Sequence, residues 1–299
     1  MLVYVNGKLV PREEAKVSVF DHGFLYGDGV FEGIRVYDGN VFRLREHIER
    51  LFESAHTIAL KLAMTLEELM DATLQTIAAN GKRDAYIRLV VSRGEGDLGI
   101  DPDKCKKGST VVIIVDSIAL YPEELYAKGI PIATSAIRRI PSECLDPRIK
   151  SLNYLNNILA KIDAKKAGVP EALMLNTRGF VAECTADNIF IVKNGSLKTP
   201  QLLHGALGGI TRAAVLELAK GAGMVTSEER LAVHDLYNAD ECFLTGTGAE
   251  VIPVIDIDGR QVGDGKPGPK TKMLLAMYRE LRTKDGAKVN YDTEPATAR

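Results

Sequence analysis

Segments typical of β-hairpins alternate with segments of helical periodicity along this chain, and this alternation constrains its fold more than any other feature. Residues 2–5 and 8–10 are apolar except for Lys8 and flank Asn6-Gly7, a strong signal for a hairpin turn. Residues 30–37 lead through the turn residues Asp38-Gly39-Asn40 into another extended segment. Because hairpins and helices are mixed, we predict an α+β fold rather than a doubly wound parallel sheet.

Helices are predicted from the spacing of apolar residues and from capping signals. Apolar residues recur at steps of three and four over residues 44–60, which predicts an amphipathic helix. Thr65 followed by Glu68 forms a capping box, which predicts a helix to about residue 79. Further helices are expected over residues 152–167, 211–221 and 270–281, and strands over residues 86–92, 110–115, 130–137, 172–175, 180–183, 188–192 and 241–244.

The length of 299 residues is that of about two domains. We predict a smaller N-terminal α/β domain over residues 1–120, an interdomain linker over residues 121–130 and a larger C-terminal domain over residues 131–283. Residues 284–299 are mostly polar or small, and this composition predicts a mobile tail.

The composition excludes several functional classes. Lys and Arg number 38 against 40 Asp and Glu, and the resulting net charge of −2 offers no electrostatic footprint for nucleic acid or an acidic membrane surface. No apolar run is long enough to span a bilayer, and the N-terminus lacks the pattern of a secretory signal. The four cysteines stand singly, so neither a disulfide framework nor a metal site is predicted. We therefore expect a cytoplasmic globular protein.

Gly27, Gly29 and Gly33 are spaced almost as in a dinucleotide-binding fingerprint. The third glycine comes one place late, and the segment leads into a strand pattern instead of opening a helix. A flexible turn between strands is therefore the better interpretation, and a nicotinamide-dependent oxidoreductase is not favoured.

Lys150 is the first candidate for chemistry, because it lies where a loop enters the helix predicted from residue 152. The positive end of the helix dipole and apolar surroundings would both oppose protonation of its amine, and a neutral lysine amine can form a Schiff base. If the first turn is helical, the phenol of Tyr154 lies on the same face. The alternative is a solvated lysine at a helix start.

Three other segments suit the same chemistry. Glu183 ends a strand in which alternation places it beside Val181, so its carboxylate needs a partner, either a pyridinium nitrogen or an ordinary arginine. Gly208-Gly209 precedes a helix whose first backbone N–H groups form an anion site. Residues 245–249 follow a strand and form a second small-residue loop suited to an anion.

Together these segments resemble the fold-type-IV pyridoxal-phosphate enzymes, and within them the branched-chain amino-acid aminotransferases. The resemblance extends from residue 4 to about residue 281 and is most specific in residues 20–35, 149–154, 209–212 and 245–252. It implies a two-domain fold like that of D-amino-acid aminotransferase, with the active site in the interdomain cleft. It also implies a homodimer or a higher oligomer built from dimers.

The resemblance assigns a role to each candidate residue. Lys150 would bind pyridoxal 5'-phosphate covalently and act as the catalytic base and acid, while Glu183 would pair with the ring nitrogen and Tyr154 with the phenolic oxygen. The cofactor phosphate would be held by Arg50, Ile210, Thr211 and Thr247. The substrate side would be formed by Tyr26, Phe31, Arg35, Tyr86 and Arg88, with Gly248 and Ala249 meeting the α-carboxylate.

The implied reaction is a ping-pong transfer of the amino group of leucine, isoleucine or valine to 2-oxoglutarate, which yields branched 2-oxo acids and L-glutamate. Two positions depart from the family pattern. Gly248 replaces the usual alanine, which loosens the loop near the α-carboxylate, and Leu89 replaces a proline often found after the Tyr-x-Arg motif.

Two rival activities share the cofactor and the fold, namely D-amino-acid aminotransferase and aminodeoxychorismate lyase. Tyr86-x-Arg88 and Gly33-x-Arg35 favour the branched-chain activity over both. A binding protein without catalytic activity would keep the phosphate loops without using Lys150 chemically.

Overall fold

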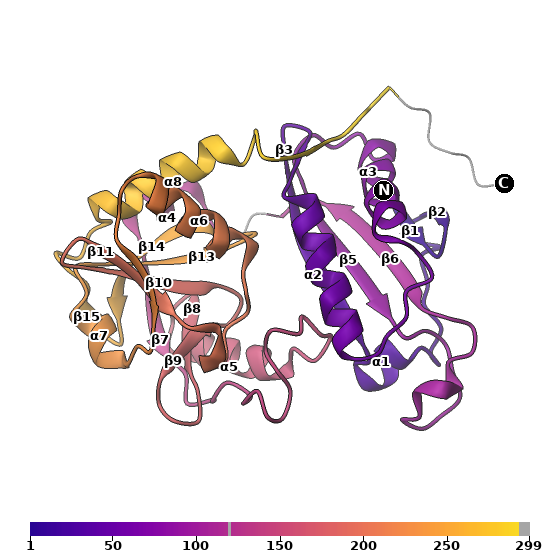
Figure 1. The fold of residues 1–299 in the computed structure, drawn as a ribbon, viewed down its shortest axis with the longest axis horizontal. Coiled ribbons are helices and arrows are strands. Elements are labelled where there is room, and N and C mark those ends of the chain that lie inside the picture. The colour runs from indigo at the N-terminus through magenta and orange to yellow at the C-terminus, as the bar shows by residue number, and fades with distance from the viewer. Residues whose placement is uncertain (119–120, 293–299) are drawn as a thin grey trace. The chain divides into compact units, whose positions relative to one another are not determined.

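The structure, a computed structural model, describes residues 1–118 and 121–292 of the chain (Figure 1). These residues form two compact units. The first contains residues 1–118, 149–153 and 282–292, and the second contains residues 121–148 and 154–281. The segment with Lys150 thus belongs to the first unit, although its neighbours on both sides in the sequence belong to the second. The predicted linker over residues 121–130 contains a short helix, α4 (Glu123–Lys128).

The first unit is built on a seven-stranded antiparallel sheet with the strand order β16-β4-β3-β5-β6-β1-β2. The predicted N-terminal hairpin is confirmed, with Asn6 at φ 46° and Gly7 at φ 92° in its turn. The strands are β1 (Leu2–Val5), β2 (Lys8–Pro11), β3 (Gly29–Tyr37), β4 (Asn40–Phe42), β5 (Ala85–Ser92), β6 (Thr110–Asp116) and β16 (Gly286–Lys288).

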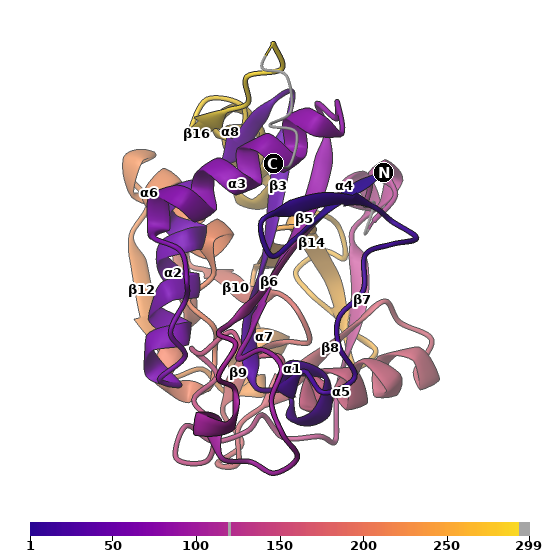
Figure 2. The same ribbon diagram turned by 90° about the vertical axis from the view of Figure 1, so that its right-hand side faces the viewer.

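Helices α2 (Leu44–Thr57) and α3 (Leu66–Ala79) pack against each other and against this sheet, and Figure 2 shows them side by side. Val30, Ile34 and Val36 alternate along β3 and lie in the core cluster that these helices cover. The capping box that starts α3 is confirmed. The unit also contains a short helix, α1 (His22–Tyr26), and the 3₁₀ turn η1 (Pro102–Lys104).

The predicted tail is part of the first unit's sheet over Gly286–Lys288, because β16 pairs with β4 in antiparallel register. Ala287 and Val289 are partly buried and pack against the core cluster. The segment therefore makes apolar contacts that its mostly polar composition did not predict. The end of the predicted tail, residues 293–299, lies outside the described residues.

The second unit is built on a nine-stranded mixed sheet with the order β12-β11-β10-β13-β14-β7-β8-β9, and with β15 beside β14. Strand β7 is parallel to both β8 and β14, and β11 is parallel to β12, while the other pairs are antiparallel. The strands are β7 (Ile130–Thr134), β8 (Glu171–Leu175), β9 (Val181–Cys184), β10 (Asn188–Lys193), β11 (Ser196–Pro200), β12 (Thr226–Glu229), β13 (Glu241–Gly246), β14 (Glu250–Ile257) and β15 (Arg260–Gln261).

Helix α5 packs on β7 and β8, while α6 and α8 pack together and against β13 (Figure 1). The helices of this unit are α4, α5 (Leu155–Lys166), α6 (Ile210–Gly221), α7 (Val233–Tyr237) and α8 (Pro269–Leu281), with the 3₁₀ turn η2 (Leu202–His204). Of the helices in the described part of the chain, none is long and apolar enough to cross a membrane.

Candidate active site

The segment that carries Lys150 is extended, so the prediction of a helix from residue 152 is wrong at its start. The N–H of Phe31 donates to the carbonyl of Lys150 at 3.0 Å, and the N–H of Leu152 donates to the carbonyl of Gly29 at 2.9 Å. These bonds attach the segment to the beginning of β3, so its backbone is used in strand pairing, and α5 begins only at Leu155. The helix dipole therefore does not act on Lys150 as predicted, and the helical face predicted for Lys150 and Tyr154 does not form.

Lys150 instead lies against an aromatic ring. Its Nζ atom is 4.7 Å from the centre of the Phe31 ring, and the guanidinium carbon of Arg88 is 4.6 Å from the same centre. Nη2 of Arg88 donates to the hydroxyl of Tyr86 at 2.9 Å. The first unit thus brings together the predicted nucleophile and three of the residues predicted for the substrate side.

The pairing of β3 with β5 explains this cluster. Gly33 lies opposite Arg88 and Arg35 lies opposite Tyr86, so these residues share one face of the sheet with Phe31. A Cβ atom on Gly33 would lie 2.1 Å from the Tyr86 hydroxyl oxygen. Glycine is therefore required here because the phenol occupies the space of a side chain.

The other two residues predicted for the substrate side, Arg35 and Tyr26, also lie in the first unit. Nη1 of Arg35 donates to the carbonyl of Ile118 at 3.3 Å, and its buried Nε has no hydrogen-bond partner among the described residues. Tyr26 lies on α1, where its hydroxyl accepts a hydrogen bond from the N–H of Gly99 at 2.8 Å. The loop before η1 therefore determines where this ring lies.

Arg50 is held by a carboxylate on the opposite face of β3. Nε and Nη2 of Arg50 donate to the two oxygens of Glu32 at 2.7 and 2.8 Å, and Nδ1 of His47 lies 2.7 Å from the same carboxylate. Glu32 and His47 are buried, with 0% and 1% of their surface exposed. Burial lowers the pKa of His47, so Arg50 is the cation of the group and Nδ1 of His47 carries the proton that Glu32 accepts. Burial opposes ionisation of Glu32, but the charge of Arg50 and the hydrogen bonds from Arg50 and His47 outweigh burial and hold its pKa well below its ordinary value.

In the second unit, Glu183 lies on β9, and its carboxylate is bound by protein groups that sequence reasoning did not identify. Nη2 of Arg139 lies 2.9 Å from Oε1, while the N–H of Leu207 and Nδ2 of Asn188 donate to Oε2 at 2.9 and 3.1 Å. The arginine considered as an alternative partner is therefore present. Since a carboxylate has about four lone-pair sites, these three donors do not by themselves exclude a pyridinium nitrogen.

The start of α6 forms a small-residue cradle beside the donors of Glu183. Gly209 is the N-cap of α6, so Ile210 and Thr211 lie in its first turn, where backbone N–H groups point outward without helical partners. A Cβ atom on Gly209 would lie 2.1 Å from Oδ1 of Asn188, the residue that also donates to Glu183. The cradle and the carboxylate are therefore built from the same part of the second unit, an arrangement that fits a ring nitrogen and a phosphate in one ligand.

The turn between β13 and β14 carries the other predicted residues, Thr247, Gly248 and Ala249. At its start, a Cβ atom on Gly246 would lie 1.9 Å from Oδ1 of Asp187, so the backbone closely approaches the segment that leads into β10. Ala249 is buried, whereas Thr247 and Gly248 are half-buried and accessible to a ligand. Tyr154 is also half-buried and occupies the N-cap position of α5.

Sequence reasoning missed Arg139, Asn188, Glu32 and His47. For Glu32 a signal was available, because a carboxylate in an otherwise apolar strand requires a buried partner. For Arg139 no local signal exists, since it lies in an irregular loop and meets Glu183 only in the folded chain. Within residues 1–118 and 121–292, no three His, Cys, Asp or Glu side chains are grouped so that they could hold a metal ion.

Comparison with known proteins identifies the family of the chain. The model of the family described as amino-transferase class IV matches residues 29–257. A putative branched-chain-amino-acid aminotransferase of Methanocaldococcus jannaschii is 54% identical over 292 residues, which cover 98% of this chain and 100% of that protein. The branched-chain-amino-acid aminotransferase of Escherichia coli K12 is 37% identical, with 94% of this chain and 93% of the relative covered.

Solved structures lead to the same family. The crystal structure of the Escherichia coli branched-chain amino acid aminotransferase has a TM-score of 0.92 at 36% identity, with 96% of each chain covered. The enzyme of Thermobaculum terrenum in its PLP-form has a TM-score of 0.85 at 33% identity, with 94% of each chain covered. The predicted fold-type-IV fold is thereby confirmed. Because the family model covers most of the sequence and the relatives align along nearly all of it, the chain belongs to the class IV aminotransferases.

Proposed function

We propose that this protein transfers the amino group of branched-chain L-amino acids to 2-oxoglutarate with pyridoxal 5'-phosphate as cofactor, giving branched 2-oxo acids and L-glutamate. The observation that carries the proposal is the position of the Lys150 amine, 4.7 Å from the Phe31 ring that Arg88 also contacts. The relatives named above bear the name of this activity, and the related structure from Thermobaculum terrenum is the form that holds this cofactor.

Each part of the cofactor has a matching group in the chain. Lys150 would bind it covalently, Glu183 would face its ring nitrogen, and Tyr154 would donate to its phenolic oxygen. Its phosphate would be held by the cation of Arg50, the N–H groups at Ile210 and Thr211, and Thr247. When bound, pyridoxal phosphate withdraws electrons from the substrate Cα and so makes that carbon acidic.

Lys150 then moves the proton. Its Nζ would take the proton from the substrate Cα as the general base and return a proton as the general acid. Glu183 is anchored by Arg139, Asn188 and the N–H of Leu207, and its fixed negative charge would face the ring nitrogen.

The substrate side explains why two kinds of substrate are accepted. Phe31 and Tyr26 offer apolar surface to a branched side chain, while Arg88 can pair with the second carboxylate of glutamate or 2-oxoglutarate. Arg35 adds a second cation on the same face of β3 and β5. The backbone at Gly248 and Ala249 would receive the α-carboxylate that all these substrates share.

A spectroscopic experiment with a matched control tests the proposal. Purified protein with pyridoxal phosphate should be yellow. Borohydride should leave the cofactor permanently attached to Lys150 and abolish the visible absorption band. The Lys150→Ala variant should lack both the visible absorption band and the transamination activity. Lys161→Ala changes a lysine on α5 that bonds to Pro170 and Glu171, and it should keep both. A protein that stays colourless with added cofactor would refute the proposal.

Parallel assays decide the substrate. L-Leucine with 2-oxoglutarate should be turned over faster than D-alanine or aminodeoxychorismate. Turnover of D-alanine without turnover of L-leucine would instead identify a D-amino-acid aminotransferase, and release of pyruvate from aminodeoxychorismate would identify a lyase of the same fold.

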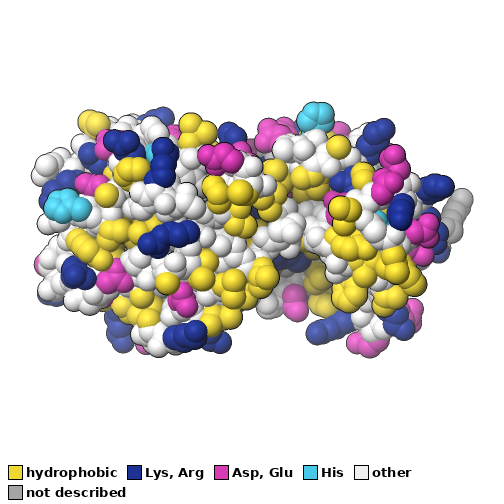
Figure 3. Space-filling view, turned by 90° about the horizontal axis from the view of Figure 1, so that it is seen from below, with side chains coloured by type: hydrophobic (Ala, Val, Ile, Leu, Met, Phe, Trp, Pro, Cys, Tyr) yellow, Lys and Arg dark blue, Asp and Glu magenta, His cyan; other side chains and the backbone are white. Residues whose placement is uncertain are grey.

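We further propose a homodimer, or a higher oligomer of dimers, in the cytoplasm. Leu155, Ile158, Leu159 and Ile162 form an exposed apolar stripe on α5, and Phe24 on α1 is 74% exposed. Figure 3 shows hydrophobic side chains on the surface of each unit. Ile158→Glu should reduce the mass measured by sedimentation, whereas Lys165→Glu on the same helix should not.

The four free cysteines fit a reducing compartment.

A further inference from the structure

Arg139 is the most thoroughly anchored cation in the second unit's site. Its Nε donates to the carbonyl of Gly205 at 3.0 Å, Nη1 donates to Oδ1 of Asn157 at 2.8 Å, and Nη2 pairs with Glu183 at 2.9 Å. The side chains of Arg139 and Glu183 are each only 7% exposed. The guanidinium thus has a single orientation, and that orientation is directed at one carboxylate oxygen.

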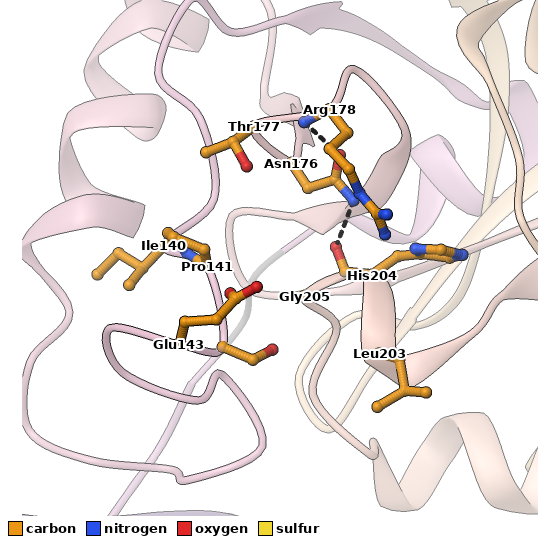
Figure 4. Close-up of a pocket in the computed structure, with 10 residues that line it drawn as sticks. Ile140, Pro141, Glu143, Asn176, Thr177, Arg178, Leu203, His204 and Gly205 are labelled. Carbon is orange, nitrogen blue, oxygen red and sulfur yellow. Dashed lines mark hydrogen bonds between the residues drawn. The ribbon is translucent and has the colours of Figure 1, made fainter.

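The surroundings hold this orientation from both sides. The N–H of Arg139 donates to the carbonyl of Leu175 at 2.8 Å, which fixes its backbone to the end of β8. Gly205, which accepts from Nε, follows His204, whose carbonyl accepts from Nδ2 of Asn176 at 3.2 Å. Figure 4 shows this last bond at the edge of a cavity of about 460 Å³, whose wall includes Gly205 and Ile140, the residue after Arg139.

Such a rigid cation has a defined effect on Glu183. A positive charge 2.9 Å away in a buried site stabilises the ionised carboxylate far more than the neutral acid. Asn188 and the N–H of Leu207 donate to the other oxygen and act in the same direction. Glu183 is thereby prevented from acting as an effective proton acceptor.

We propose that Arg139 is a positioning residue that keeps the proton shared between Glu183 and the cofactor ring on the ring nitrogen. The inference rests on the proposed function. The step that Arg139 suppresses is a single proton transfer in which the N–H bond of the ring breaks and an O–H bond to Glu183 forms, so that both groups become neutral. A neutral ring withdraws electrons from the substrate Cα less strongly, and proton removal by Lys150 slows.

The alternative is a merely structural ion pair, which stabilises the fold without affecting the proton. Spectroscopy separates the two roles. Holoenzyme loaded with pyridoxal phosphate that carries ¹⁵N in its ring should give the signal of a protonated ring nitrogen near neutral pH. In Arg139→Met the signal should move toward that of unprotonated pyridine, and Arg139→Lys should restore most of the protonated signal.

Kinetics supply the second readout. Arg139→Met should slow deuterium exchange at the substrate Cα by at least about tenfold, the factor that corresponds to one pKa unit of proton affinity. KM for L-leucine should change much less, because Arg139 is not among the residues proposed for the substrate side. Arg43→Met is the matched control, since Arg43 is also buried and ion-paired, to Asp285, and lies in the first unit. It should change thermal stability without changing the ¹⁵N signal.

Each outcome has a separate meaning. If Arg139→Met binds the cofactor and keeps both the wild-type ¹⁵N signal and the wild-type exchange rate, the positioning role is refuted while the proposed function stands. If Arg139→Met does not fold, Arg139→Lys and Glu183→Gln still test the role, because Glu183→Gln removes the proton acceptor and Arg139→Lys keeps the cation. A wild-type ring nitrogen that is already unprotonated would also overturn the inference. Failure of the wild-type protein to bind the cofactor would refute the function itself.

Discussion

Replacing Glu32 by glutamine should destabilise the first unit strongly, because the change removes the anion from a buried group. Glu32 is 0% exposed and accepts from Arg50 at 2.7 and 2.8 Å and from His47 at 2.7 Å. Without the carboxylate, the guanidinium of Arg50 stays largely buried, with 12% of its side chain exposed, and loses the anion with which it pairs in this group. Breaking a buried pair in this way costs roughly 3–5 kcal/mol.

Urea unfolding at pH 7.5 measures this loss directly, and thermal unfolding should show a fall of roughly 6–12 °C for about 3 kcal/mol. Glu67→Gln is the matched control. Glu67 also accepts two hydrogen bonds from an arginine of α2, at 2.8 and 3.0 Å from Arg45, but both side chains are at least half exposed. Solvent screens that pair, so the control should unfold like the wild type.

The dependence on pH provides an internal check. The pKa of Glu32 lies well below its ordinary value of 4.5, since the charge of Arg50 and the hydrogen bonds from Arg50 and His47 favour the ionised form in the folded state. Its contribution is therefore fully present above about pH 4.5 and is lost as the pH falls further toward the folded-state pKa. The difference between wild type and Glu32→Gln should shrink on acidification. Equal stability of the two proteins at pH 7.5, or a difference that grows in acid, would refute this reasoning.

Two glycine substitutions test the packing of the site. Gly33→Ala would place a methyl group 2.1 Å from the Tyr86 hydroxyl. In steady-state assays it should raise KM for 2-oxoglutarate by about tenfold, a loss within the usual cost of overpacking. Adding Tyr86→Phe should recover part of this loss. Gly209→Ala would place a methyl group 2.1 Å from Asn188 and should weaken cofactor binding by about tenfold in a titration. Gly221→Ala, at the end of the same helix with open space around it, should leave cofactor binding unchanged.

Local patterns predicted much of the secondary structure. The hairpin at Asn6-Gly7 and the capping box at Thr65 were predicted because the residues that form them lie within a few positions of each other. The helix predicted over residues 44–60 forms as α2 but ends at Thr57, and the strand predicted over residues 130–137 ends at Thr134. Such ends depend on contacts that periodicity does not describe.

The parts of the site that were not predictable are those made by residues far apart in the sequence. The extended conformation at Lys150 arises because its segment pairs with β3, and this pairing outweighs the helical pattern that follows it. The partner of Glu183 was left open between a ring nitrogen and an arginine, and the fold places Arg139 there. The buried group of Glu32, His47 and Arg50 likewise requires α2 to lie on β3.

The sequence by itself determined the types of element and, through its motifs, which side chains are candidates for chemistry. Both depend on chemical identity and on short-range spacing, which the chain carries in any conformation. Only the tertiary structure decided how each candidate is held: Lys150 against the Phe31 ring, Arg50 on a buried carboxylate, and Glu183 under Arg139. Burial and close charge contacts exist only after strands and helices have packed, and these contacts set the ionisation and orientation on which the proposed reaction depends.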